Sequence, residues 1–142
     1  RLDKLTHLFV KHAEEGDTLR AGQILVAPAD KHFSIVKKDN ERVVHLEDRV
    51  GPQTGPRPRI DEIMSEVAKS YGAEVVGIIL TGMGEDGREG VEKIKQAGGF
   101  VIAQNPETAS ISSMPDAIIK AKLVDEILRP EDIVTSLTKL VI

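Results

Sequence analysis

Residues 75–87 of the chain are V-V-G-I-I-L-T-G-M-G-E-D-G, and this stretch decides the fold. The apolar run at 75–80 predicts a buried strand, and residues 88–97 predict a helix. Between them lies a glycine-rich turn that carries two acids, Glu85 and Asp86. Open α/β sheets place their chemistry at such turns, beyond the carboxyl ends of the strands. We therefore look for a functional site in residues 81–87.

The second half of the chain alternates strands and helices around this turn. A helix is predicted over 60–71, where Gly72 ends a run of apolar residues at helical spacing. A buried strand at 100–103, a helix at 115–122, an edge strand at 124–128 and a helix at 130–141 follow. Repeated units of this kind predict a parallel sheet with right-handed crossovers.

The first half of the chain is predicted to form short strands. Candidate strands lie at 6–10 and 23–27, and residues 32–36 and 42–46 predict a hairpin around 37–41. Residues 47–58 are rich in proline and predict a loop. Taken together, we expect an α/β fold, a doubly wound, mostly parallel sheet with helices on both faces and an antiparallel hairpin. The loops at 28–31, 81–87 and 104–110 are expected on one rim of that sheet.

Composition excludes several classes of function. Net charge is −4, aromatic residues make up 3% of the chain, and the basic residues are dispersed, so nucleic-acid binding is not expected. The chain has no cysteine, which excludes disulfides and thiolate chemistry and fits a cytoplasmic location. No apolar run is long enough to span a membrane. The chain begins at Arg1, inside a predicted helix, so we expect residues 1–142 to be truncated at the amino end.

The glycine loop itself allows three interpretations. Residues 82–87 match G-x-G-x-x-G, a dinucleotide-binding pattern, but two carboxylates in the turn would repel a pyrophosphate. Alternatively, Asp86 caps the helix that follows, with Glu89 completing a capping box. Lastly, Asp86 could be the acid of a hydrolytic triad that orients a histidine. The pattern alone does not choose among them.

Several ordered blocks of this sequence resemble one family. They are Leu80-Thr81-Gly82-Met83-Gly84-Glu85-Asp86-Gly87, Gln96-Ala97-Gly98, Ile102-Ala103-Gln104, Met114-Pro115-Asp116-Ala117-Ile118, Gly22 to His32, Glu14 to Asp17, and Arg57-Pro58-Arg59-Ile60-Asp61. In their order along the chain and in their spacing, these blocks resemble the carboxyl-terminal half of the chemotaxis protein-glutamate methylesterases of the CheB type. The resemblance extends over nearly all 142 residues.

The resemblance implies a serine hydrolase that removes methyl groups from glutamyl methyl esters on chemoreceptors, and many members also deamidate receptor glutamines. It implies that Asp86 is the triad aspartate and that Met83 lies beside the oxyanion, its backbone N–H binding the tetrahedral oxygen. It further implies methylated chemoreceptors as partners, with a fused receiver domain and the chemotaxis kinase as additional candidates. Neither a cofactor nor a metal is implied.

The chain also departs from the pattern of this family. The family's nucleophilic serine and triad histidine precede the region matched here, and no G-x-S-x-G occurs in residues 1–142. We therefore expect the isolated chain to be inactive, and a non-catalytic interaction module with the same fold stays open. His32 is a weak substitute for the missing base. Arg59 replaces a usual serine, and Ser112-Ser113 replaces an aromatic residue and a glycine; both changes are expected to be neutral.

Overall fold

A computed structural model describes residues 2–49 and 59–141 of the chain. Within these ranges the strands form three ladders, and the fold is α/β, as the sequence predicts. Parallel strands β5 (Val76–Ile79), β6 (Phe100–Gln104) and β7 (Glu126–Leu128) lie side by side in that order. Strands β1 (Phe9–His12) and β2 (Gln23–Val26) form a second parallel pair. The parallel strands are thus divided into two ladders among the described residues.

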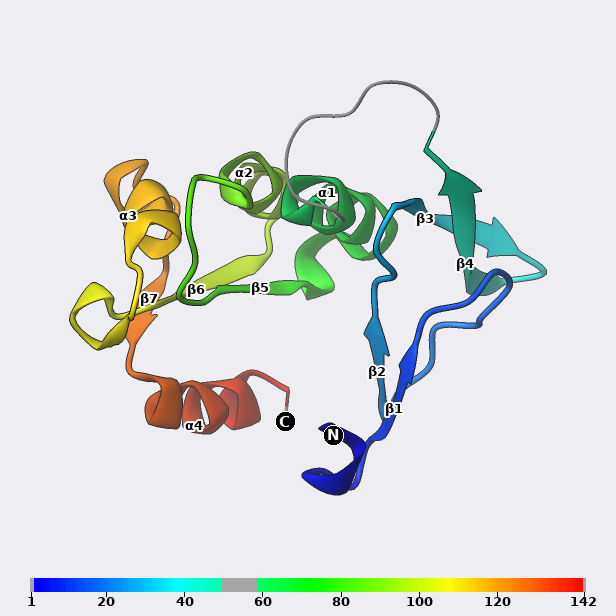
Figure 1. Cartoon of the computed structure of the whole chain (residues 1–142), viewed down its shortest axis with the longest axis horizontal. Helices are drawn as coiled ribbons and strands as arrows, with labels where there is room; N and C mark the ends of the chain where they lie inside the picture. The colour runs from blue at the N-terminus through cyan, green and yellow to red at the C-terminus, as the bar shows by residue number, and fades with distance from the viewer. Residues whose placement is uncertain (1, 50–58, 142) are drawn as a thin grey trace.

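Helices cover the three-stranded ladder on opposite sides (Figure 1). Helices α1 (Ile60–Tyr71) and α2 (Arg88–Gln96) lie on one side of it, and α4 (Pro130–Leu140) lies on the other. Helix α3 (Ser113–Lys120) packs through buried Ile118 into the main core. That core is formed by apolar side chains from β5, β6 and the first three helices, including Ile79, Ile94 and Val101.

The antiparallel hairpin is longer than predicted. It consists of β3 (Lys31–Lys38) and β4 (Glu41–Asp48), joined by a turn at Asp39 and Asn40. Both turn residues have positive φ, 51° and 65°, which is the geometry of a two-residue turn that matches strand twist. The ladder therefore occupies residues 37–38 and 47–48, which were predicted to be turn and loop. Residues 50–58, the rest of the predicted loop, lie outside the described residues.

A second, smaller core supports the hairpin. Phe33 of β3 and Val44 of β4 pack with Ala13, which follows β1. Ile63 of α1 packs against this cluster, so α1 contacts both cores. Three-residue 3-10 helices lie at Leu2–Lys4, Gly72–Glu74 and Pro106–Thr108. No helix in the described part of the chain is long and apolar enough to cross a membrane.

Candidate active site at the glycine loop

The loop after β5 is fixed to the segment that follows β6. The backbone N–H of Thr81 donates to Oε1 of Gln104 at 2.8 Å, and that of Gly82 donates to the carbonyl of Ile111 at 2.9 Å. Gln104 is buried, and its amide nitrogen donates to the carbonyl of Thr108 at 3.2 Å. One buried amide therefore joins the two loops. The predicted rim is confirmed for these loops, whereas residues 28–31 lead into the hairpin and lie apart from them (Figure 1).

Asp86 is a helix cap, but for a different helix from the predicted one. Its Oδ2 accepts the backbone N–H of Ile60 at 2.9 Å, and its Oδ1 accepts that of Asp61 at 3.0 Å. These are the first N–H groups of α1, which lack partners within the helix. The residue preceding α1 is Arg59, which makes no capping hydrogen bond through its side chain. Asp86, which lies in the loop before α2, therefore caps the start of α1.

The predicted capping box at α2 is wrong. Gly87 stands at the N-cap of α2 with φ 105°, a left-handed conformation, and no side-chain cap hydrogen bond forms there. Instead, Oδ1 of Asp61 accepts the N–H groups of Gly87 and Gly90, at 2.9 Å and 2.7 Å. Each helix start is therefore capped by a carboxylate from its neighbour. Asp86, in the loop before α2, caps α1, and Asp61, in α1, caps α2.

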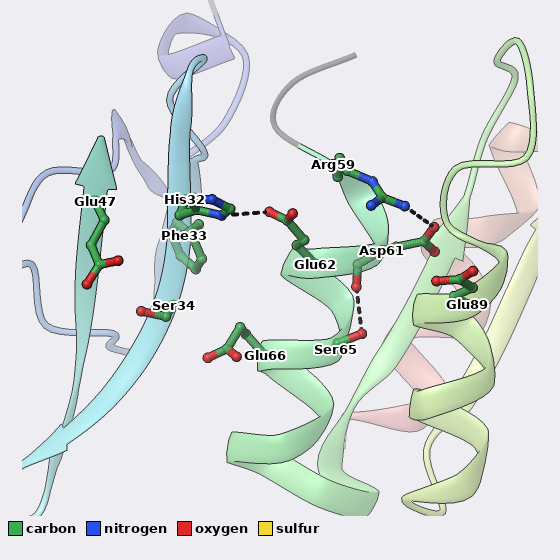
Figure 2. A pocket seen from close by; sticks show the side chains of 10 residues that line it. All are labelled: His32, Phe33, Ser34, Glu47, Arg59, Asp61, Glu62, Ser65, Glu66 and Glu89. Carbon is green, nitrogen blue, oxygen red and sulfur yellow. Dashed lines mark hydrogen bonds and ion pairs between the residues drawn. The ribbon is translucent and has the colours of Figure 1, made fainter. Parts of the chain in front are cut away.

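Asp61 is a buried neighbour of Asp86 whose contacts the sequence did not reveal. It is 7% exposed, and its pKa is raised, first by burial and then by the negative charge of Asp86. Figure 2 shows Asp61 with Arg59, whose Nη2 lies 3.7 Å from Oδ2, and with Ser65, whose hydroxyl donates to the carbonyl of Asp61 at 2.7 Å. The only available signal was an acid in the first turn of a helix, which is common and usually local in its effect.

The same geometry argues against a dinucleotide at G-x-G-x-x-G. A pyrophosphate would need the free N–H groups at the start of α2, and Asp61 already accepts two of them. Close packing explains Gly87 and, after the motif, Gly90. A Cβ at Gly90 would lie 2.6 Å from Cβ of Met64, and one at Gly87 would lie 2.7 Å from Cδ1 of Ile79. Contacts with α1 and β5 therefore account for Gly87, the last glycine of the motif, and contacts with α1 account for Gly90.

Met83 lies in the loop between β5 and α2 and is 78% exposed. The peptides on both sides of it are tied to the start of α3. Ser113 Oγ donates to the carbonyl of Gly82 at 3.1 Å and accepts the N–H of Gly84 at 3.1 Å. The structure thus places the predicted site residues Met83 and Asp86 on one anchored loop, with fixed backbone on either side.

A separate cavity of about 530 Å³ lies between the hairpin and α1 (Figure 2). His32 lines it, with Nδ1 3.4 Å from Oε2 of Glu62, and neither Met83 nor Asp86 belongs to its lining. His45 lies between Glu15 and Glu47, at 3.0 Å and 2.9 Å, which raises its pKa. His7 and His12 are exposed. Among the described residues, no group of three or more potential ligands could hold a metal ion.

Comparisons with known proteins identify the family of this chain. The family model for the CheB methylesterase matches residues 1–137. The chain belongs to the CheB methylesterase family. It is 41% identical to a protein-glutamate methylesterase/protein-glutamine glutaminase of Moorella thermoacetica over 141 residues, which cover 99% of this chain and 33% of that protein. A protein of the same name from Pyrococcus horikoshii is 38% identical over 142 residues, 99% of this chain and 38% of the relative.

The solved structure of the CheB methylesterase catalytic domain from Thermotoga maritima matches with a TM-score of 0.92 and 34% identity. The match covers 99% of this chain and 74% of that domain. The chain therefore spans about a third of the length of its full-length CheB relatives. The fold and the family that the motif blocks indicate are confirmed.

Proposed function

We propose that the protein carrying this chain hydrolyses glutamyl methyl esters on chemoreceptors, with Asp86 as the acid of a Ser-His-Asp triad. The observation that carries the proposal is the position of Asp86. In a chain of the CheB methylesterase family, its carboxylate is held by two helix N–H groups on an anchored loop beyond a parallel strand. Deamidation of receptor glutamines follows from the same chemistry, because an amide carbonyl is attacked in the same way.

The cap leaves Asp86 free to bind a histidine. A carboxylate has about four lone-pair positions, and the two N–H groups of α1 use one on each oxygen. A remaining lone pair can accept Nδ1–H of the triad histidine, which fixes the tautomer whose Nε2 takes the serine proton. The two N–H bonds also restrict rotation of the carboxylate. A single residue thus serves as cap and orienting acid.

The reaction proceeds in two halves. The serine hydroxyl attacks the ester carbonyl while the histidine takes its proton, and the tetrahedral oxygen binds the N–H of Met83. The intermediate collapses, the histidine protonates the departing methanol, and an acyl-enzyme forms. Water, deprotonated by the same histidine, then attacks the acyl-enzyme, and the histidine returns the proton to the departing serine oxygen as the glutamate side chain is released. Asp86 stabilises the imidazolium that forms in each half.

The serine and the histidine belong, in this proposal, to sequence outside residues 1–142. The domain match supports this, because 74% of the Thermotoga maritima domain is covered. Residues 1–142 are then part of a methylesterase catalytic domain and release no methanol alone. Methylated chemoreceptors are the substrates, a receiver domain and the chemotaxis kinase are regulatory partners, and the location is cytoplasmic.

The test uses the protein as the cell makes it, with whatever sequence flanks these residues. Methanol release from methylated receptor is measured, and a fluorophosphonate probe identifies the reactive serine by mass analysis of the labelled peptide. We expect methanol release and a single labelled serine that lies outside residues 1–142. Receptor binding without methanol release or labelling would favour the non-catalytic module. Labelling of a serine within residues 1–142 would contradict the assignment of the nucleophile.

A further inference from the structure

The hydroxyl of Ser113, the first residue of α3, contacts the glycine loop at two points. It donates to the carbonyl of Gly82 and accepts the N–H of Gly84, each at 3.1 Å. A hydroxyl has one donor and two acceptor positions, so both bonds form at the same time. The two backbone groups lie on either side of Met83. Ser113 therefore bridges the two peptide groups that flank Met83.

This contact sets the orientation of one peptide group. The carbonyl of Gly82 and the N–H of Met83 belong to the same planar trans peptide, so they point in opposite directions. The N–H of Met114 also donates to the carbonyl of Gly82, at 3.2 Å. Two donors at the start of α3 therefore hold that carbonyl toward α3. The N–H of Met83 is directed the opposite way.

The loop needs such a restraint because it is built from glycines. Gly82 and Gly84 flank Met83, and Gly84 has φ 86°. Glycine passes between positive and negative φ at little cost, so the peptides beside it can rotate. A rotated peptide would place a carbonyl where the N–H of Met83 should be. An oxyanion donor contributes to the rate only when it is already oriented before the reaction.

We infer that Ser113 is a positioning residue that holds the N–H of Met83 in the orientation required to bind the oxyanion. This inference rests on the proposed function, in which that N–H is the donor. Ser113 acts through the peptide and touches no reacting atom. The hydroxyl of Ser113 is the side-chain donor to the carbonyl of Gly82. The inference departs from the expectation that the change at 113 is neutral, and the experiment below decides between them.

Three variants of the complete protein test the inference. Ser113→Ala removes the hydroxyl, and Ser113→Thr keeps it. Ser112→Ala is the matched control, because Ser112 Oγ donates to Asp116 at 2.7 Å within the same helix start. Two readouts are measured: hydrogen exchange of the Gly84 amide, and kcat and KM for methanol release from methylated receptor.

For Ser113→Ala we expect Gly84 exchange to rise by about tenfold, since its acceptor is lost. We also expect kcat to fall by about tenfold with KM unchanged, because a displaced oxyanion donor affects only the transition state. Ser113→Thr should retain both properties, and Ser112→Ala should alter neither.

Three results would overturn the inference. Unchanged Gly84 exchange in Ser113→Ala would show that the hydroxyl does not restrain the loop. An equal fall of kcat in Ser112→Ala would show that the effect is a general loosening of α3. Normal kcat in Ser113→Ala would contradict the catalytic consequence while the proposed function stands. If the unaltered protein releases no methanol, the proposed function itself fails, and Ser113-dependent exchange then shows a structural brace only.

Discussion

Asp61 and Asp86 each supply a carboxylate to the start of the neighbouring helix. Asp86 binds the first N–H groups of α1, and Asp61 binds those at the beginning of α2. The burial of Asp61 and, to a smaller extent, its repulsion by Asp86 raise the pKa of Asp61. The hydrogen bonds that Asp61 receives from Gly90 and Gly87 lower its pKa and so oppose this increase. The start of each helix is therefore coupled to the position of the other.

Replacing Asp61 tests whether its hydrogen bonds to the start of α2 stabilise the fold. Asp61→Ala leaves the N–H groups of Gly87 and Gly90 buried without their acceptor, and we expect it to lower the free energy of unfolding by about 2–4 kcal/mol. Asp61→Asn keeps an amide oxygen and removes the buried charge, so the loss should be under about 1 kcal/mol. Urea denaturation of the complete protein measures both. Equal losses of unfolding free energy in the two variants would show that the charge of Asp61, and not its hydrogen-bond acceptor, stabilises the fold.

The local sequence pattern predicted that Asp86 caps a helix, but it predicted the wrong helix. An acid before a helix, followed three positions later by a glutamate, suggested that Asp86 caps α2. Its partners, Ile60 and Asp61, lie 26 and 25 residues earlier in the chain. A partner that tertiary packing brings into place leaves no signature in local spacing. For the same reason, the hydroxyl of Ser113 gave no sign of its contact with Gly82 and Gly84.

At the scale of elements, α1 and α2 approach each other closely at Gly90. A Cβ there would lie 3.1 Å from Cα of Asp61 as well as against Met64, so backbone blocks its accommodation. In an open helix, glycine to alanine stabilises by about 1 kcal/mol. Here we expect Gly90→Ala to destabilise by about 1–3 kcal/mol, because the helices must separate.

Thermal unfolding measures this change, with Glu92→Ala as control on the exposed face of the same helix. The control should shift Tm little. A stabilised Gly90→Ala would show that α1 and α2 move apart freely, and it would remove the packing explanation for that glycine.

A hydrogen bond between Glu15 and the titratable side chain of His45 connects the turn at residues 14–17 to β4. His45 Nδ1 lies 3.0 Å from Glu15 and Nε2 lies 2.9 Å from Glu47, and hydrogen bonding to Glu15, then to Glu47, raises the pKa of His45. A raised histidine pKa stabilises the fold below the unfolded value of about 6.5. This stabilisation is lost as pH rises through the folded pKa.

We therefore expect the urea midpoint of the unaltered protein to fall between pH 5.5 and 8.5 by more than that of His45→Gln. Lys11 and Asp17 carry shifted pKa values near the same turn, but both keep their charge over this range, so they do not mimic the effect. Identical pH profiles for the two proteins would show that the contact contributes nothing to stability.

Regular elements were the most predictable part of the fold. The limits of α1 agree with the prediction because its apolar positions repeat at helical spacing up to a terminating glycine. The hairpin turn was predicted too long, because Asp39 and Asn40 both accept positive φ and allow the ladder to continue to its tip. Helix α3 begins at Ser113, two residues before the predicted start, since proline is tolerated throughout a first turn.

At the scale of the molecule, the division of the parallel strands into two ladders could not be predicted. Repeated strand and helix units indicate parallel strands, but the order in which distant strands pair is decided by packing. Among the described residues, β5 pairs with β6 alone and β1 pairs with β2 alone. Each ladder therefore has an edge that can accept another strand.

The isolated 142-residue chain should consequently self-associate as its concentration rises. Sedimentation velocity measures this, and Phe9→Lys, on exposed β1, should reduce association because a charge at an edge opposes strand pairing. Val134→Lys is the control, since Val134 is a similarly exposed apolar residue on α4. Equal effects of the two substitutions would indicate general apolar adhesion instead of edge pairing.

The central claim is that Asp86 orients a catalytic histidine in addition to capping α1. The most direct measurement is kcat for methanol release by the complete protein with Asp86→Asn, together with its urea stability. Asparagine keeps one acceptor for α1 and favours the wrong histidine tautomer. We predict a fall in kcat of about 10⁴-fold with a loss of stability below about 1 kcal/mol. Turnover near that of the unaltered protein would show that Asp86 is a helix cap only.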